Sequence, residues 1–240
     1  MTTEHPPHAD AQRHMQMRNA VHWTAQVLAA TQDALLTHAA DDSHAALSWD
    51  PCRGIAGQPL PDGSQLTLRL VEPAILHLAG GQVASSFSLD GQSLSAAFDW
   101  VNQAVPGLGA SRQASPRNYD MPAHPFGVSG ARFQNDPDAL AQLTQALGDA
   151  HQTLQRFASD QPHTTALWLW PHHFDLGLLW LPSPAADPQK DPSLGLGFSL
   201  GDAAIQHPYY YANPYGITDA PLASLALGED APSWRGHVLR

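Results

Sequence analysis

Three stretches of this 240-residue chain repeat apolar residues at steps of three and four, and short strand-like segments fill the sequence between them. Such spacing is typical of amphipathic helices. We expect helices at about 19–38, 93–105 and 138–158, the last with Asp136 as N-cap and Pro137 at its first position. Because these helices do not alternate one by one with strands, the pattern favours an α+β fold in which they pack on a mostly antiparallel sheet.

The segments between the helices alternate apolar and polar residues or form short apolar runs bounded by glycine and proline. These patterns predict strands, with a hairpin turn at Gly80-Gly81 and a loop at 54–63. The expected strands are 46–49, 66–71, 74–78, 83–89, 167–170, 175–181, 194–199 and 209–211. The order of the elements is also compatible with two helix-plus-meander halves, at 19–105 and 137–216.

The remaining segments are predicted to lack regular structure. Residues 1–18 are polar and read as a disordered arm, whereas 19–240 read as one α+β domain because no charged linker divides them. The segment 106–136 is rich in proline and glycine and holds several arginines. A loop this long inside a compact domain is either a mobile connector or a lid over a ligand.

Charge and composition exclude several classes of protein. The chain has 11 Lys+Arg against 22 Asp+Glu, a net charge of −11 at pH 7. Because such a chain repels phosphate groups, we expect no nucleic-acid partner. No apolar run approaches the roughly 20 residues that span a bilayer, and the first residues lack the apolar part of a signal peptide. We therefore expect a cytoplasmic protein without a membrane partner. Its one cysteine, Cys52, excludes an intramolecular disulfide.

The most informative part of the sequence is 164–216, which contains four expected strands. If neighbouring strands pair in sequence order, the second runs away from the end that carries His172, His173 and Asp175, and the third returns to that end. The fourth strand would then begin at the same place. We therefore predict one polar site at this edge of the sheet, with the following side chains: His172, His173, Asp175, Ser199, Asp202 and His207.

These residues have expected roles, each with a simpler alternative. His173 and His172 are candidates for acid–base catalysis, and Asp175 for orienting an imidazole by accepting its N–H group. Since adjacent residues of an extended chain point to opposite faces, at most one histidine is expected to reach a given ligand. The alternative for Asp175 is to close a turn. The expected ligand-binding wall consists of Tyr209, Tyr211, Ser199 and Trp170.

Two patterns suggest more specific chemistry. His172, His173, Asp202 and His207 offer the mixed imidazole and carboxylate ligands that suit zinc or iron. None of the familiar ligand spacings is present, so the sequence leaves a bound metal and any other cofactor open. Residues 197–201 match the G-x-S-x-G pattern of serine hydrolases, which requires a helix directly after the serine. A strand-like run follows here instead, and we expect no serine nucleophile.

Three blocks of this part of the sequence resemble the signature of an uncharacterised bacterial protein family, a domain of unknown function. The blocks are WPHHFD at 170–175, GFSLGD at 197–202 and PYYY at 208–211. The resemblance extends over most of 20–237, and it groups the three blocks without implying an activity. This chain has Leu200 and Tyr210 where the resemblance implies a proline and a phenylalanine or tryptophan.

Three classes of function fit these observations. A small-molecule-binding protein and a metal-assisted hydrolytic enzyme both need a concave, aromatic-lined polar site, and the enzyme also needs a histidine with a shifted pKa. A structural or interaction protein without a catalytic site would instead expose an aromatic patch, for which Trp180 and Trp234 are available. The sequence favours the first two classes and leaves the ligand and the oligomeric state open.

Overall fold

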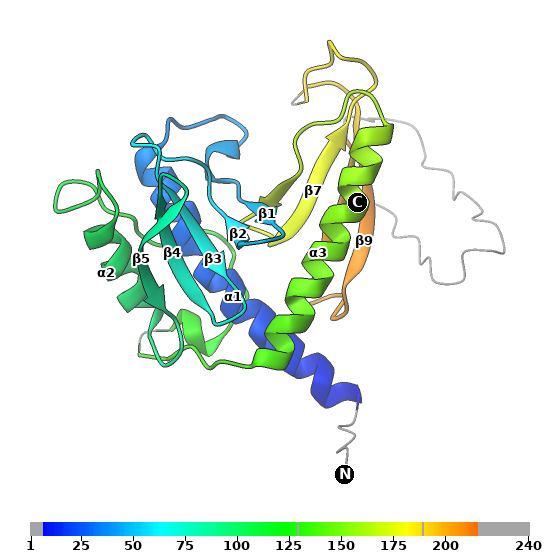
Figure 1. Ribbon diagram of the computed structural model, residues 1–240. Coiled ribbons are helices and arrows are strands. Elements are labelled where there is room, and N and C mark those ends of the chain that lie inside the picture. Colours follow the sequence, from blue (N-terminus) through cyan, green and yellow to red (C-terminus); the bar gives the residue numbers. More distant parts are fainter. Residues whose placement is uncertain (1–6, 129, 189, 216–240) are drawn as a thin grey trace.

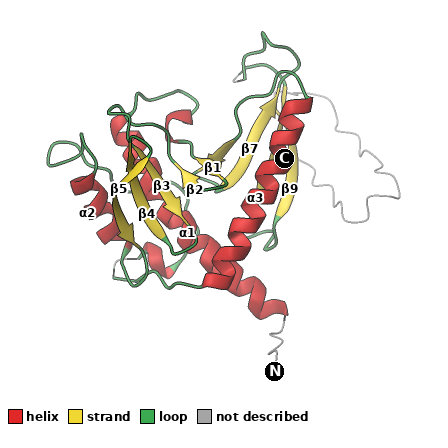
Figure 2. Cartoon of the chain, in the orientation of Figure 1, coloured by secondary structure: helices red, strands yellow, loops and turns green. Residues whose placement is uncertain are grey.

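The computed structural model describes residues 7–128, 130–188 and 190–215, which form helices and two antiparallel sheets (Figures 1 and 2). The helices are α1 (Pro7–Leu35), α2 (Leu94–Ala104) and α3 (Pro137–Asp160), with short 3-10 turns η1 (Ser43–Ala45) and η2 (Pro125–Gly127). The first sheet contains β1 (Ser48–Asp50), β2 (Gly54–Ala56), β3 (Gln65–Arg69), β4 (Ala74–Ala79) and β5 (Gln82–Ser88). The second contains β6 (Trp168–Trp170), β7 (Asp175–Trp180), β8 (Ser193–Ser199) and β9 (Tyr209–Tyr215). The predicted α+β class is confirmed.

In both sheets the strands pair in sequence order, as the meander prediction requires. The sheets meet at one antiparallel bridge, where Leu47 and Leu169 exchange backbone hydrogen bonds of 2.9 and 2.8 Å. Both leucine side chains are fully buried, so this junction lies in the core. Helix α3 packs against β1, β7 and β8, and α1 runs diagonally past both sheets (Figure 1). No helix in the described ranges is both long and apolar enough to cross a membrane.

Local signals in the sequence located most turns and helix ends. Asp136 caps α3 by accepting the backbone N–H of Ala139, and Pro137 begins the helix. The two glycines between β4 and β5 both have positive φ, which glycine adopts at little cost. The expected loop 54–63 is wrong at its start, because β2 pairs there with β1 and β3. Strand β9 continues past the predicted end, to Tyr215.

Helix α1 begins at Pro7, so the prediction of a disordered arm is wrong for residues 7–18. Residues 1–6 of that arm lie outside the described part of the chain, as does the predicted irregular tail from Gly216. The helix is buried on all sides from Met17 to Gln32, apart from the half-buried Trp23. Before Met17, residues 11–16 are mostly polar and are exposed or half-buried, so no apolar stripe marks this part of the helix in the sequence.

Buried polar side chains of α1 bind the turn between β6 and β7. His22 Nε2 lies 2.7 Å from the carbonyl oxygen of Pro171, and the Gln26 amide donates to the same oxygen at 2.6 Å. Arg18 donates to the carbonyl oxygen of His173 at 3.1 Å. Because buried carbonyl groups need hydrogen-bond partners, these three side chains, four residues apart along one face of α1, fix the turn in place.

Burial, together with the neighbouring Arg18, His173 and His172, lowers the pKa of His22 to about 3. The unfolded chain takes up a proton at this residue below about pH 6.5, whereas the folded protein does not until about pH 3. Stability should therefore fall as the pH falls through this window. We expect the free energy of unfolding to drop by about 2 kcal/mol more between pH 7 and pH 5 in the wild type than in His22→Gln. Urea unfolding at both pH values measures the difference, and equal drops would contradict the assignment.

The described residues of 106–136 are irregular apart from η2, as predicted, but they are anchored to the core. Phe126 and Phe133 are buried and pack edge to face, with ring centroids 5.5 Å apart. The indole of Trp23 on α1 donates to the carbonyl oxygen of Pro122 at 3.0 Å.

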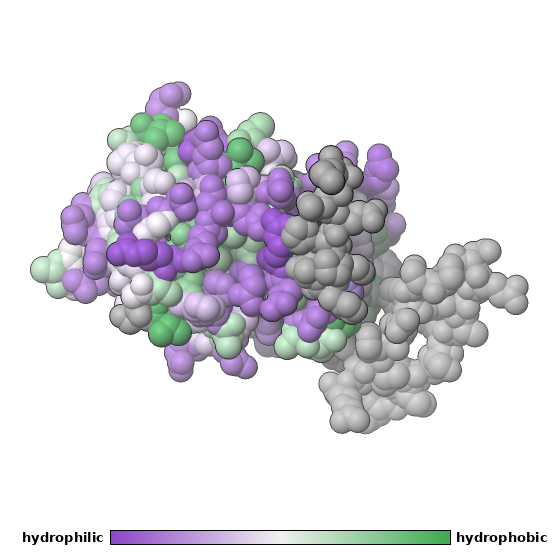
Figure 3. Space-filling model, turned by 90° about the horizontal axis from the view of Figure 1, so that it is seen from below, coloured by the Kyte–Doolittle hydropathy of each residue, from purple (hydrophilic) through white to green (hydrophobic). Residues whose placement is uncertain are grey.

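The described surface seen from below is mostly hydrophilic, with small separate hydrophobic areas (Figure 3).

Candidate functional site

The register of the second sheet brings the predicted residues to one end. Asp175 on β7 pairs with Ser199 on β8, and Ser199 pairs with Tyr209 on β9. The predicted return of the chain between Leu181 and Leu194 is therefore confirmed. Residues at every second position point to the same face, so Asp175, Ser199 and Tyr209 share the face opposite to the one that packs on α3.

Two glycines allow Tyr211 to lie across this face. Two residues after Asp175 on β7 comes Gly177, which pairs with Gly197 on β8. Gly197 in turn pairs with Tyr211 on β9. A Cβ atom at position 177 would lie 3.0 Å from the Tyr211 hydroxyl, and one at position 197 would overlap the same ring. Because both side chains are absent, the phenol reaches across β8 and donates its hydroxyl to Asp175 Oδ2.

Asp175 is only 9% exposed, and its other oxygen, Oδ1, is buried without a hydrogen-bond partner. Burial raises the pKa of its carboxyl group, although the Tyr211 hydroxyl and the two histidines act in the opposite direction. Burial and the adjacent carboxylate also raise the pKa of Tyr211 far above its usual value. The phenol therefore keeps its proton and acts as the donor in this pair.

A second tyrosine–carboxylate pair lies beside the first. Tyr209 donates to Asp202 Oδ2 at 2.6 Å, and Asp202 Oδ1 accepts the backbone N–H groups of Ala204 and Ile205 at 2.7 and 2.8 Å. Burial acts to raise the pKa of Asp202, but these hydrogen bonds lower it overall. Asp202 thus closes the turn after β8, which is the simpler of the roles open to a turn aspartate.

Ser199 ends β8 and is buried, and its oxygen accepts the N–H of Gly201 at 3.1 Å. The chain continues from Gly201 through a turn into β9, without a helix. This geometry agrees with the expectation that the G-x-S-x-G pattern is not a serine nucleophile.

The two histidines lie together in the β6–β7 turn rather than on opposite faces of a strand, so the prediction that they diverge is wrong. Their ring centroids are 4.3 Å apart, with His172 half-buried and His173 exposed. The turn depends on Phe174, which has a φ of 58° and a fully buried ring stacked on His22 at 4.9 Å. Non-glycine residues rarely adopt positive φ, and such strain is often found at functional sites.

Aromatic rings surround His172. Trp170 and Tyr119 each have a ring centroid 5.7 Å from that of His172. Burial lowers the pKa of His172, and the adjacent His173 lowers it further. Both changes favour the neutral imidazole at neutral pH.

The sequence did not point to Arg18 or Tyr119. Arg18 is 5% exposed, and its charge interacts with Asp202, Asp175 and Tyr209. The four-residue spacing of Arg18, His22 and Gln26 in a helix was the available signal for it. Tyr119 lies in an irregular loop and left no signal. We call the following residues the turn site: Arg18, Tyr119, Trp170, His172, His173, Asp175 and Tyr211.

The loop 106–136 also places Arg117 beside the turn site. Arg117 forms ion pairs with Asp42 at 2.6 Å and with Asp33 at 3.0 Å, and Tyr119 donates to the other oxygen of Asp42 at 2.7 Å. Two carboxylates therefore already balance the Arg117 cation, which does not support a lid that offers it to an anionic ligand.

The predicted metal-ligand set is not assembled. The ligand atoms of His172, His173, Asp202 and His207 do not converge on one point, and His207 is exposed on the loop before β9. In the described part of the chain, the histidine, cysteine and acidic side chains that do converge in this way are Asp33, His38 and His44.

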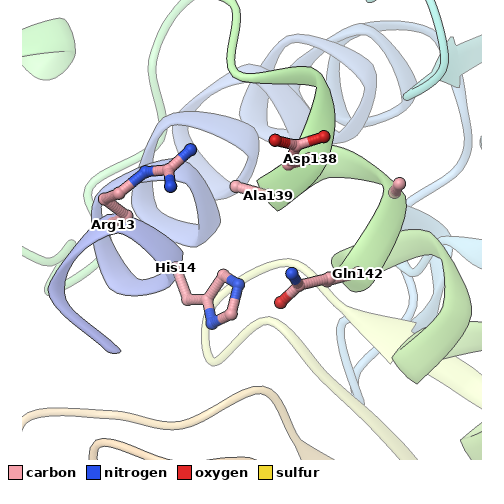
Figure 4. A pocket seen from close by; sticks show the side chains of 6 residues that line it. Arg13, His14, Asp138, Ala139 and Gln142 are labelled. Atoms are coloured by element: carbon pink, nitrogen blue, oxygen red, sulfur yellow. The ribbon is translucent and has the colours of Figure 1, made fainter. Parts of the chain in front are cut away.

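A hollow of about 420 Å³ lies elsewhere, between the first turns of α3 and the facing part of α1 (Figure 4). Arg13 and His14 of α1 line it together with Asp138, Ala139, Ala141 and Gln142 of α3. Arg13 donates to Asp136 from two nitrogens, from Nε to Oδ2 at 3.1 Å and from Nη2 to Oδ1 at 2.9 Å, which joins the two helices. This contact explains the arrangement of the side chains without a ligand.

Comparison with known proteins places the chain in a family. A family model described as "Family of unknown function (DUF5996)" matches residues 6–226. No curated protein and no solved structure shows a significant match. The match covers the three blocks and both sheets, and it brings no activity with it.

Proposed function

The chain belongs to the DUF5996 family, a family of unknown function, and we propose that it binds a small organic molecule at the turn site. Asp175 and Tyr211 would anchor the polar groups of the ligand, with Trp170, His172 and Tyr119 along its aromatic side. The absence of nucleic-acid partners and the cytoplasmic location remain predictions from composition.

The unpaired oxygen of Asp175 carries this proposal. A buried polar atom without a partner costs about 1–3 kcal/mol, so few are retained without a reason. Arg18 Nε and His172 Nδ1 are also buried without partners, and both residues interact electrostatically with Asp175. A ligand that donates to Asp175 and accepts from Arg18 would satisfy these atoms. We therefore expect a molecule with both donor and acceptor groups.

The surroundings of these atoms suit a ring-shaped ligand. The indole of Trp170 and the hydroxyl of Tyr211 both lie close to Gly177. The two aromatic side chains are therefore neighbours above a part of the sheet where the glycine has no side chain. Binding sites for small molecules commonly combine such aromatic walls with a few polar groups. Trp170 and Tyr211 are half-buried, which leaves part of each ring accessible.

Binding fits the geometry better than acid–base catalysis. A catalytic histidine usually hydrogen-bonds the carboxylate that orients it. Here His172 Nδ1 and Asp175 Oδ1 both lack partners, so these two atoms are not bonded to each other. We therefore propose His172, His173 and Asp175 as ligand contacts rather than as catalytic groups.

Thermal-shift screening tests the proposal. Wild-type protein is screened against sugars, polyols, amines, amino acids and nucleosides, and each hit is repeated with Tyr211→Phe and with the matched control Tyr210→Phe. Tyr210 lies on the opposite face of β9, with its ring 5.0 Å from that of Phe198. We expect hits that stabilise the wild type and Tyr210→Phe and that lose most of their effect in Tyr211→Phe. Hits that stabilise Tyr211→Phe equally would contradict the proposal.

A structural role without a ligand is the alternative, and one observation favours it. The Pro171 carbonyl oxygen accepts from both His22 and Gln26, so the first sequence block also fastens the second sheet to α1. If this were its whole purpose, no compound in the screen would raise the melting temperature of the wild type.

A further inference from the structure

We propose that Asp33, His38 and His44 form a binding site for a divalent transition-metal ion, with Zn²⁺ as the preferred ion. This site is separate from the turn site and does not depend on the proposed function. One ligand atom from each of the three residues lies within 4.8 Å of the others, the geometry expected of residues that share an ion.

The distances fit three ligands of a tetrahedral ion. Ligand atoms at the usual zinc bond lengths of about 2.0–2.2 Å lie roughly 3.4 Å from one another in a tetrahedron. His44 Nε2 lies 3.0 Å from Asp33 Oδ1, and His38 Nε2 lies 3.8 Å from the same oxygen. The two imidazole rings are stacked, with centroids 4.5 Å apart, so the two histidines lie beside each other.

Two imidazoles and one carboxylate are a ligand set that zinc commonly takes, leaving a fourth position for water or a substrate. The hard cations Ca²⁺ and Mg²⁺ prefer oxygen ligands throughout, which this site does not offer. The donor set therefore selects a borderline transition metal rather than an alkaline-earth ion.

The end of helix α1 also favours a cation. Asp33 lies in the last turn of α1, which ends at Leu35, and His38 lies three residues beyond that end. The C-terminus of a helix carries partial negative charge on its free carbonyl groups. Asp42 Oδ1 lies 3.8 Å from His44 Nε2 and adds a second carboxylate. Arg117 balances only part of this negative charge, through its ion pairs with Asp33 and Asp42.

Metal binding would change the protonation of both imidazoles, because His38 Nε2 donates to the backbone carbonyl oxygen of Asp33 at 3.1 Å and would have to release that proton to bind the ion. His44 Nδ1 accepts the backbone N–H of Ala39 at 3.2 Å, so the proton of the neutral ring is on Nε2, directed at Asp33. A metal on Nε2 would move that proton to Nδ1 and break the bond to Ala39, which is at the long end of the normal range. Arg117 Nη1 lies 3.0 Å from the same Asp33 oxygen, so this oxygen would bind the ion in exchange for the guanidinium, which would keep Asp42 as its partner at 2.6 Å.

Calorimetric titration with ZnCl₂ tests this site in full-length, EDTA-treated and desalted protein. His38→Gln is the test variant, because the His38 side chain is 69% exposed and its loss should not affect folding. His207→Gln is the control, since His207 is exposed and lies outside the cluster. We expect the wild type and His207→Gln each to bind one equivalent of Zn²⁺ tightly. In His38→Gln the Zn²⁺ affinity should be lower by about tenfold or more.

A thermal-shift measurement provides a second readout. Zn²⁺ should raise the melting temperature of the wild type and of His207→Gln, and should raise that of His38→Gln much less. Equal Zn²⁺ affinities in the wild type and His38→Gln would overturn the proposal. A wild type without a tight equivalent would overturn it as well.

Discussion

Replacing Gly197 by alanine is expected to lower the free energy of unfolding by about 3 kcal/mol, the upper end of the usual cost of overpacking. A Cβ atom at this position would overlap the Tyr211 ring and would lie 2.5 Å from the backbone oxygen of Leu176. The ring could move aside only by leaving Asp175, and the Leu176 carbonyl is fixed in the middle of the sheet. Urea unfolding of both proteins measures the loss.

Gly148→Ala is the matched control for this prediction. Gly148 lies within α3, and a Cβ there would meet only Trp49 Nε1 at an ordinary distance of 3.8 Å. Since alanine is a better helix former, Gly148→Ala should raise stability by about 0.5–1 kcal/mol. If Gly197→Ala were as stable as the wild type, the close packing of Tyr211 over β8 would be wrong.

Tyr211→Phe is expected to lower the free energy of unfolding by about 2 kcal/mol at pH 7, because it removes the hydrogen-bond donor from a buried carboxylate. Burial already raises the pKa of Asp175, and the Tyr211 hydroxyl lowers it, so the pKa should rise further in the variant. A carboxyl group whose folded-state pKa is raised destabilises the protein increasingly as the pH rises above its unfolded-state pKa. The loss should therefore be larger at pH 7 than at pH 4.

Tyr210→Phe is the control, since its hydroxyl lies on the other face of the same strand. Urea unfolding of the wild type, Tyr211→Phe and Tyr210→Phe at pH 7 and pH 4 measures the loss of stability in each variant at each pH. A loss in Tyr211→Phe that does not change with pH would argue against a direct bond to the Asp175 carboxylate.

Local patterns predicted most of this fold because the strands of both meanders pair with their neighbours in sequence. Alternation and turn residues then suffice to place each strand, and the register of β7, β8 and β9 follows from the hairpin order. The start of α1 escapes such patterns because residues 11–16 are mostly polar and are exposed or half-buried, so they carry no apolar stripe.

The site was predictable to the level of the strand and not to the level of the side chain. The pairing of Asp175, Ser199 and Tyr209 follows from strand order alone. The direction of each polar side chain depends on neighbours that strand order does not give. The Asp202 carboxylate accepts a backbone N–H of its own loop, and Arg18 of α1 binds His173, more than 150 residues away in the sequence.

The metal ligands illustrate the same limit. The convergence of the three sequence blocks favours ligands among the histidines of those blocks, but the ligand atoms of these histidines do not converge in the structure. The group that does converge, Asp33, His38 and His44, lies within twelve residues of sequence. Its signal is local, namely two histidines shortly after an aspartate at the end of a predicted helix.

The hydrogen bond between Tyr211 and Asp175 is the feature on which the turn site depends, and proton NMR tests it most directly. A buried phenol bonded to a carboxylate should give a downfield, slowly exchanging hydroxyl resonance. We predict such a resonance in the wild type and in Tyr210→Phe, and its loss in Tyr211→Phe. Its absence from the wild type, or its persistence in Tyr211→Phe, would contradict a turn site built around this bond.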